Sequence, residues 1–345
     1  MKIEGMNWWD RVRLLGSPGP RVGDLPRAPM IERSPTGPII RSRGAGAIIV
    51  GIEGSKRSAD ALALADLLAG LIGGAPVLVH NHSYGAPANL PEPQEGGHLG
   101  RSASDLAFAR VQKLARRYPE AGVRLTHAPS PAQGLQESVA RENAQLIVVG
   151  PSHRSGLGQT LPGSVGERLL SGARVPVAIA PRGYADAVPS LGLVAIAFDG
   201  SPESCLALDW AADLARSSRS NLRVISVHAP TAYAGFGFPA TSVDPAIRRG
   251  LQEEQSAAIA AYDGPVESIV PDGDPARTLI EASQEADILV MGSRGYGPLR
   301  AALLGGVSHY VIRHAACPVV VLPRGADRVD SPLPEQEPVV RDAAA

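Results

Sequence analysis

The chain has 345 residues, of which 44% are hydrophobic and 19% are charged, a composition typical of globular proteins with buried cores. A formal net charge of −1 at pH 7 gives no overall basic surface for nucleic acid or an anionic membrane, so we expect neither partner. The length favours about two domains. Cys205 and Cys317 lack the spacing of metal ligands, and we expect free, buried thiols in a reducing compartment.

The two ends of the chain differ in composition from the rest. Residues 1–44 combine repeated Pro and Gly with an excess of basic side chains, whereas residues 326–345 have an excess of acidic ones. We interpret them as a flexible N-terminal extension and a flexible C-terminal tail, with docking of a tail on a partner as the alternative. The first thirty residues contain no apolar run long enough for a signal peptide or a membrane helix, which predicts a cytoplasmic location.

The rest of the chain contains one unit twice. The segment from residue 47 onward aligns with the segment from residue 193 onward, which places Glu53 opposite Asp199. A later block of each copy aligns in the same way and places Gly150 opposite Gly292. We therefore expect a first domain at 45–183, a linker at 184–190 and a second domain at 191–325.

Each copy is expected to contain five strands that alternate with four helices. An apolar strand comes first, followed by a helix in which Leu64, Leu67, Leu68 and Leu71 keep the i, i+3, i+4, i+7 spacing. Further elements are expected as strands at 77–82, 146–150, 223–228 and 288–292 and as helices at about 101–117 and 245–261. Strands that are apolar throughout and separated by helices predict two tandem doubly wound, five-stranded parallel-sheet α/β domains of the Rossmann-like type.

An acid stands at the end of the first strand of the second copy, where doubly wound folds collect their ligands. Asp199 is well placed there to accept hydrogen bonds from a ribose or a base. Ser201 and Pro202 follow it, and we interpret them as the N-cap and the first turn of the next helix.

Glycines follow the fourth strand of the second copy at Gly292, Gly295 and Gly297, and Gly305 and Gly306 precede the next helix. Glycines let backbone N–H groups face a ligand, and a helix N-terminus adds partial positive charge, so this loop is a candidate phosphate cradle. A loop that merely needs left-handed conformations would explain the first glycines equally well.

At these residues both repeats resemble universal stress protein domains, over the full length of each repeat. Nucleotide-binding members of that family carry G-x2-G-x9-G-(S/T) after the fourth strand and an Asp after the first. In the second copy Gly292, Gly295 and Gly305 fit, but Gly306 replaces the Ser/Thr and Ala197 replaces the glycine that often precedes the Asp. The resemblance implies an adenine nucleotide alpha-hydrolase-like fold for each half.

The first copy departs from this pattern at other positions. The residues that fit are Gly51, Gly150, Gly163 and Ser164. Glu53 replaces the Asp, and His153 replaces the second glycine. Because the stretch resembles a variant found among tandem members of the family, His153 and Arg154 are candidates to face phosphate.

The resemblance further implies that each half holds one adenine nucleotide, ATP or AMP, with or without Mg²⁺. A backbone contact to adenine at the end of the second strand maps to Asn81 in the first copy and Val227 in the second. The nucleotide-binding residues implied for the second copy are Asp199, Val227, Gly292, Arg294, Gly295, Gly297, Gly305, Gly306, Val307 and Ser308. Those implied for the first copy are Gly51, Glu53, Asn81, Gly150, His153, Arg154, Gly163 and Ser164.

Enzymatic functions have little support in the sequence. There is no G-x-S-x-G nucleophile elbow, and neither glycine loop carries the lysine of a GxxxxGK(S/T) phosphate site. The family resemblance also implies binding, with slow incidental ATP hydrolysis at most. His80 and His82 share one face of a strand, and a metal site there is a minor alternative to two histidines that simply end the strand.

Two hypotheses of different classes therefore stand. The leading one is a cytoplasmic ATP-binding stress regulator that changes conformation or regulatory protein partner with bound nucleotide. The alternative is a scaffold of the same fold that binds no nucleotide and acts through dimerisation and protein partners. The resemblance implies that the strands within 175–180 and 317–322 pair antiparallel, either inside one chain or in a homodimer.

Overall fold

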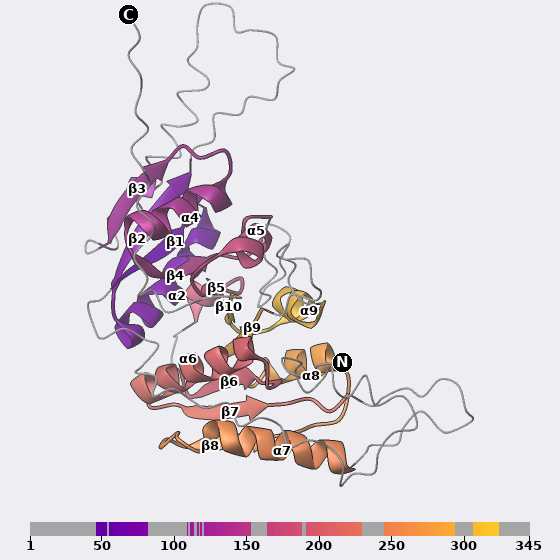
Figure 1. Ribbon diagram of the computed structural model, residues 1–345. Helices are drawn as coiled ribbons and strands as arrows, with labels where there is room; N and C mark the ends of the chain where they lie inside the picture. Colours follow the sequence, from indigo (N-terminus) through magenta and orange to yellow (C-terminus); the bar gives the residue numbers. More distant parts are fainter. Residues whose placement is uncertain are drawn as a thin grey trace, which may run out of the picture.

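A computed structural model of the protein describes residues 46–53, 55–81, 109, 111–113, 116, 118, 121–152, 164–187, 191–229, 245–293 and 306–323. The two tails and most of the helix expected at about 101–117 lie outside the described residues. Each half contributes five strands to the described structure, and helices alternate with them as the repeat predicts (Figure 1).

The elements of the first half follow the predicted order. They are β1 (Ala47–Gly51), α2 (Lys56–Ile72), β2 (Ala75–Asn81), β3 (Gly122–Thr126), α4 (Pro131–Arg141), β4 (Ala144–Val149), α5 (Ser164–Gly172) and β5 (Val177–Ile179). A short 3₁₀ helix, η2 (Tyr184–Asp186), occupies the start of the segment that we expected as a linker.

The second half repeats this order. Its elements are β6 (Leu193–Ala197), α6 (Pro202–Ser218), β7 (Asn221–Ile225), α7 (Pro245–Ile259), β8 (Val266–Ile269), α8 (Pro275–Ala282), β9 (Ile288–Gly292), α9 (Gly306–His314) and β10 (Val319–Leu322). The strand expected at 223–228 begins and ends earlier. Beyond Ile225 only an isolated parallel bridge between His228 and Asp272 continues the pairing.

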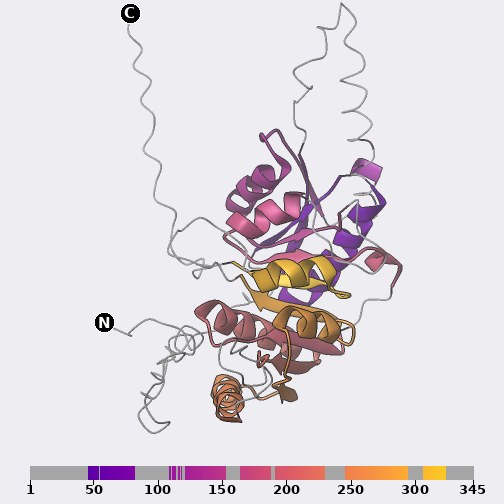
Figure 2. The same cartoon turned by 90° about the vertical axis from the view of Figure 1, so that its right-hand side faces the viewer.

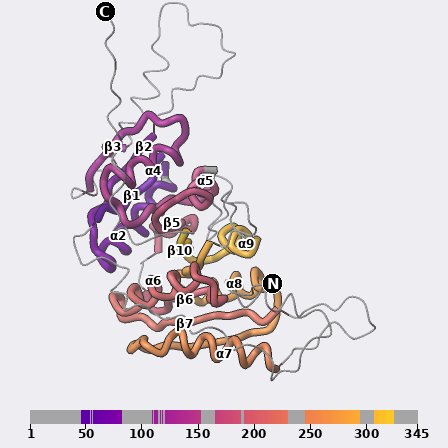
Figure 3. The backbone as a smooth tube through the Cα atoms, viewed as in Figure 1, coloured from indigo at the N-terminus to yellow at the C-terminus, as the bar shows by residue number. Residues whose placement is uncertain are grey.

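The ten strands form one continuous sheet in the order β3-β2-β1-β4-β5-β10-β9-β6-β7-β8. Its neighbours are parallel except at the centre, where β5 of the first half pairs antiparallel with β10 of the second half and Ala178 lies opposite Val320. The indigo-to-magenta half and the orange-to-yellow half consequently meet at β5 and β10 in the tube view (Figure 3). This confirms the antiparallel pairing and places it within one chain.

Two apolar cores lie on opposite faces of the sheet. Alternate residues of each strand point to opposite faces, so Ile48 packs in one core and Ile49 in the other. Helices α2 and α6 cover the first face, and α4, α5, α8 and α9 cover the second (Figure 2). Strands that are buried on both faces explain the continuous apolar runs that predicted a parallel sheet.

The two cysteines, neither of which is in a disulfide, differ in burial. Cys317 is buried beside the central strand pair, and burial raises the pKa of its thiol to about 12. Cys205 is half-buried on α6. The expectation of two buried thiols is therefore confirmed for Cys317 and is wrong for Cys205, which faces outward enough to remain partly exposed.

Candidate functional site

The strand order of each half reverses at one place, which is where doubly wound folds usually bind their ligands. In the first half β1 lies between β2 and β4, and in the second half β6 lies between β7 and β9. The loops that follow β1 and β4, or β6 and β9, therefore leave neighbouring strand ends in opposite directions. The acids and glycines singled out in the sequence stand in these loops.

In the second half the acid after β6 lies in a turn that starts α6. The Asp199 backbone N–H donates to Ser204 Oγ at 3.3 Å, and Asp199 Oδ1 accepts from the Ser201 N–H at 3.0 Å. Ser201 Oγ accepts from the Ser204 N–H at 3.2 Å, which confirms Ser201 as the N-cap of α6. Gly200 has a φ of 71°, a left-handed conformation that favours glycine. Hydrogen bonds thus fix the orientation of the Asp199 carboxylate.

The first half repeats only part of this arrangement. The Glu53 backbone N–H donates to Ser58 Oγ at 2.9 Å, the counterpart of the contact between Asp199 and Ser204. Ser55, however, makes no side-chain capping bond to α2. The Glu53 side chain is 58% exposed and lies 3.9 Å from Arg57. The acid of the first half therefore extends further into solvent than Asp199.

The first glycine of each cradle motif has a packing role. A Cβ on Gly292 would lie 2.8 Å from the carbonyl carbon of Glu203, in the first turn of α6. A Cβ on Gly150 would lie 2.6 Å from the carbonyl oxygen of Arg57, in the first turn of α2. Each glycine lets a helix start closely beside a strand end, so these two positions need glycine whether or not a ligand binds.

The residue two positions before each strand-end acid is less tightly packed. A Cβ on Gly51 would lie 3.1 Å from Leu135 and 3.3 Å from Val149, and both contacts are with side chains. Small shifts of side chains can relieve such contacts, and the second half has Ala197 at the matching position. Position 51 therefore tolerates a side chain more readily than position 150, where a Cβ would meet backbone atoms.

A hydrogen bond brings the start of α9 back to the end of β9. Ser308, which is buried, donates from Oγ to the carbonyl oxygen of Gly292 at 3.2 Å. Gly306 is exposed at the helix start, and a Cβ there would meet nothing within 4 Å. Val307 is half-buried against the core. The first turn of α9, with its backbone N–H groups, therefore lies beside the end of β9.

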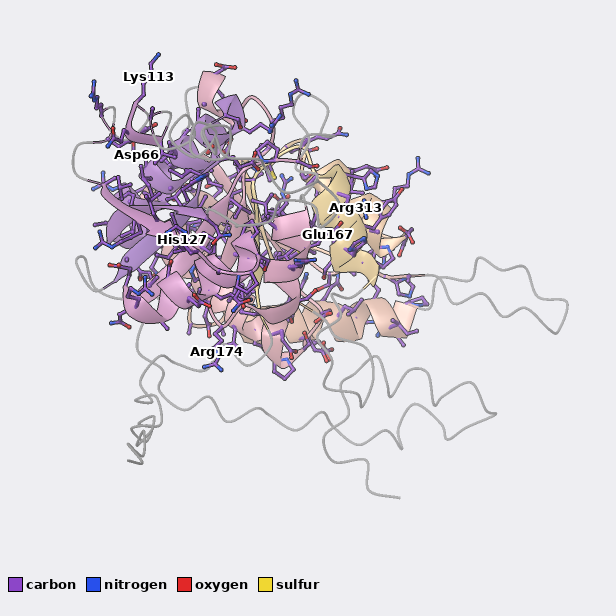
Figure 4. All side chains as sticks on the ribbon, turned by 90° about the horizontal axis from the view of Figure 1, so that it is seen from above. Asp66, Lys113, His127, Glu167, Arg174 and Arg313 are labelled. Atoms are coloured by element: carbon purple, nitrogen blue, oxygen red, sulfur yellow. The ribbon has the colours of Figure 1, made fainter. Side chains whose placement is uncertain are left out.

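The two helices that follow the cradle loops differ in charge. The first turn of α9 contains no acidic residue, whereas α5, which begins at Ser164, has Glu167 in its first turn. Glu167 forms an ion pair at 3.4 Å with Arg313 of α9, which joins the two halves (Figure 4). An acid in the first turn of a helix disfavours a bound anion, so the start of α9 is more favourable for an anion than the start of α5.

The remaining cradle residues lie outside the described part of the chain. They are His153, Arg154, Gly163, Arg294, Gly295, Gly297 and Gly305. Their assignment to a nucleotide site stays a prediction from the sequence.

The two residues expected to contact adenine differ in position, since Asn81 ends β2 whereas Val227 lies two residues beyond the end of β7. The Asn81 side chain is used in the fold: its Oδ1 accepts from Thr126 Oγ1 at 2.8 Å and from the Ala128 N–H at 2.9 Å. Val227 is 7% exposed and packs in the core. In both cases the side chain is used for packing, which is compatible with a ligand contact through the backbone.

A polar cluster that the sequence analysis did not identify lies next to Val227. His228 Nδ1 is 2.9 Å from Asp272 Oδ1, and Asp272 Oδ2 pairs with Arg248 of α7. The hydrogen bond from His228, with help from Arg248, lowers the pKa of the Asp272 carboxyl. These three residues come from separate stretches of chain, and no spacing pattern connects them in the sequence.

The minor alternative of a metal site gains no support among the described residues. His80 Nδ1 is 2.9 Å from the carbonyl oxygen of Ile52. His82 lies outside the residues that the structure describes. Within the described ranges no group of three His, Cys, Asp or Glu side chains could hold a metal ion.

Two doubly wound units, joined edge to edge and each with an acid and a glycine where the strand order reverses, define a tandem α/β protein. The chain belongs to the universal stress protein family, whose family model matches residues 45–181 and 193–323. None of the helices in the described part is long and apolar enough to span a membrane.

Individual proteins are similar to this chain over most of its length. Universal stress protein Rv2005c of Mycobacterium tuberculosis is 31% identical over 289 residues, which cover 79% of this chain and 96% of that protein. The crystal structure of a universal stress protein from Archaeoglobus fulgidus has a TM-score of 0.65 at 21% identity, with 82% of this chain and 100% of that chain covered. The functionally unknown protein PA1789 from Pseudomonas aeruginosa has a TM-score of 0.57 at 20% identity, with 82% and 94% covered.

Proposed function

We propose that this universal stress protein is a regulator that binds ATP. The observation that carries the proposal is the geometry of the second half, where Asp199 follows β6 and the start of α9 is bonded to the end of the neighbouring strand β9. The Asp199 carboxylate is held in a turn and offers an acceptor for a ribose or base. The first turn of α9, fixed by the bond from Ser308 to Gly292, offers N–H groups and partial positive charge for phosphates.

The two halves are proposed to bind nucleotide unequally. Glu167 in the first turn of α5 lowers the affinity of the first half for phosphate. Glu53 is also one methylene longer than Asp199, and its side chain is 58% exposed. We therefore expect one tighter site in the second half and one weaker site in the first.

The proposed output is a change of conformation or of protein partner, with slow hydrolysis at most. Mg²⁺ would accompany the ATP phosphates, as it does in solution. A cytoplasmic location fits a function that depends on the cellular ATP supply.

The second candidate function is a scaffold that binds no nucleotide. It is favoured by the close approach of α6 to Gly292 and of α2 to Gly150, because packing alone accounts for these glycines. It is also compatible with the β5–β10 pair, which supplies a rigid double unit for protein contacts without any ligand.

Calorimetric titration of ATP with Mg²⁺ into the full chain separates the two candidates. Asp199→Asn keeps an oxygen acceptor for the Ser201 N–H but removes the charge, and we expect a ten- to hundred-fold weaker second-half site. Gly295→Val should weaken the same site, whereas Gly163→Val and His153→Ala should affect only the first half.

Glu281→Gln is the matched control, since it removes one carboxylate from an exposed pair with Arg277 on α8. It should leave both affinities unchanged. Absence of binding heat in the wild type at millimolar ATP, together with no nucleotide released on denaturing the purified protein, would favour the scaffold.

A further inference from the structure

The two halves use different side chains to connect the ends of their second and third strands. In the first half the neutral amide of Asn81 does so: its Oδ1 accepts from Thr126 and Ala128, and its Nδ2 donates to the Ala128 carbonyl oxygen at 3.1 Å. The matching residue in the second half is Val227, which has no polar group to offer. In the second half, other side chains must therefore form the hydrogen bonds at the place where the base is expected to bind.

His228 and Asp272 form these hydrogen bonds. The backbone N–H of His228 donates to Pro271 O at 2.9 Å, and the N–H of Gly273 donates to His228 O at 3.0 Å. The side chain of His228 is 2% exposed, and its Nδ1 lies 2.9 Å from Asp272 Oδ1. The end of β7 is thus bound to the loop after β8 through both backbone and side chain.

The second carboxylate oxygen of Asp272 connects this junction to α7. It pairs with Arg248, in the first turns of that helix. Only Leu251 and Gln255 of α7 are fully buried, and Gln255 is bonded to Ser226 and to the carbonyl oxygens of Val224 and Ile269. Helix α7 is accordingly held on the sheet by polar contacts from Gln255 and Arg248 as well as by apolar side chains such as Leu251.

Helix α7 also reaches the loop that carries the strand-end acid. A Cβ on Gly200 would lie 2.9 Å from a carboxylate oxygen of Glu254, so this side chain packs against the residue next to Asp199. A shift of α7 would therefore disturb the Asp199 loop as well as the end of β7. Both ends of the proposed base and ribose site depend on where α7 lies.

We propose that Asp272, through His228 and Arg248, positions the nucleotide site of the second half. The carboxylate accepts from both donors at once and fixes the segment after β7, where the Val227 backbone would contact the base, together with α7 and the Asp199 loop. The inference rests on the proposed function, and it names positioning residues that do not themselves touch the nucleotide.

The charge on Asp272 is the essential property of this cluster. A carboxylate has acceptor sites for both an imidazole N–H and a guanidinium, and such charge-assisted bonds are stronger than neutral ones. An aspartate carboxyl is ionised at neutral pH, and the hydrogen bond from His228 lowers the pKa of Asp272 further. An amide in its place has one acceptor atom and one donor atom, and the donor would face Arg248.

The test is the calorimetric titration of Mg²⁺-ATP into the full chain at pH 7, with the second-half site identified as the one that Asp199→Asn weakens. Asp272→Asn is expected to weaken that site about tenfold and to leave the first-half site unchanged. Arg248→Gln, at a 38% exposed side chain, should weaken it less, and Arg248→Lys should restore part of the loss. Glu281→Gln is the matched control and should change neither site.

Thermal unfolding of each variant is measured alongside. If Asp272→Asn lowers the melting temperature while the second-half affinity stays at the wild-type value, the cluster is structural only and the proposal is overturned. If Asp272→Asn does not fold, unchanged second-site affinity in Arg248→Gln overturns it. A wild type that binds no ATP overturns the proposed function and this inference together, whereas wild-type binding at two sites with no effect of these variants overturns the inference alone.

Discussion

Asp60 Oδ2 accepts a hydrogen bond from the backbone N–H of Gly183 at 3.1 Å, and this bond ties helix α2 to the segment that joins the two halves. Oδ1 of the same carboxylate accepts from the Ala185 N–H at 2.9 Å, so Asp60 caps the turn η2. The side chain is 5% exposed. At the far end of the segment Asp287 accepts from the N–H groups of Gly192 and Leu193 at 2.7 and 2.8 Å. The connection is therefore held at both ends.

Replacing Asp60 with Ala should destabilise the protein. The change leaves two backbone N–H groups without their acceptor in a partly buried place, at a cost of about 1–3 kcal/mol in the free energy of unfolding. Urea denaturation measures the loss. Asp186→Ala, at an exposed position of the same turn, is the control and should fall within about 0.5 kcal/mol of the wild type. Equal effects of the two substitutions would show that Asp60 has no special role.

The halves should not be stable monomers when they are expressed separately. Separation exposes β5 in one half and β10 in the other, and each presents unpaired backbone groups and fully buried apolar side chains such as Ala178 and Val320. We expect self-association or precipitation, read by size-exclusion chromatography with light scattering. Two soluble monomers with cooperative unfolding would contradict this.

Two glycines of the cradle motif should respond differently to a methyl group. Gly292→Ala places a Cβ 2.8 Å from the Glu203 backbone and should cost about 1–3 kcal/mol, because helix and strand must move apart. Gly306→Ala meets open space at the start of α9 and should leave stability within about 0.5 kcal/mol. Chemical denaturation of both variants without nucleotide provides the comparison. If Gly306→Ala lost stability and Gly292→Ala did not, the packing role assigned to Gly292 would be wrong.

The free energy of unfolding should depend on pH in the acid range because of Asp272. The folded state holds the pKa of this carboxyl below its usual value of 3.8, so its stabilising contribution is complete above that value and is lost as the pH falls through the lowered pKa. The difference in unfolding free energy between the wild type and Asp272→Asn should therefore shrink between about pH 4 and pH 2. Urea titrations from pH 5 downward measure it. A difference that stays constant to pH 2 would contradict the assignment.

The repeat, the alternation of strands and helices, and the parallel sheet follow from the sequence alone. Apolar runs such as Ile48 to Val50 leave no polar face, so only a strand covered on both sides satisfies them. The N-cap at Ser201 is equally local, since its hydroxyl bonds a residue three positions along the chain. Periodicity and capping act over a few residues and can be read directly.

Tertiary structure decided what depends on contacts between distant segments. The need for glycine at Gly292 comes from the first turn of α6, which the sequence places almost ninety residues earlier and the fold places within 3 Å of a Cβ. The cluster of His228, Arg248 and Asp272 likewise unites a strand end, a helix and a loop. Hydrogen bonds and ion pairs depend on the distance between atoms in space. The number of residues between two side chains does not determine that distance, so only the folded molecule shows which side chains meet.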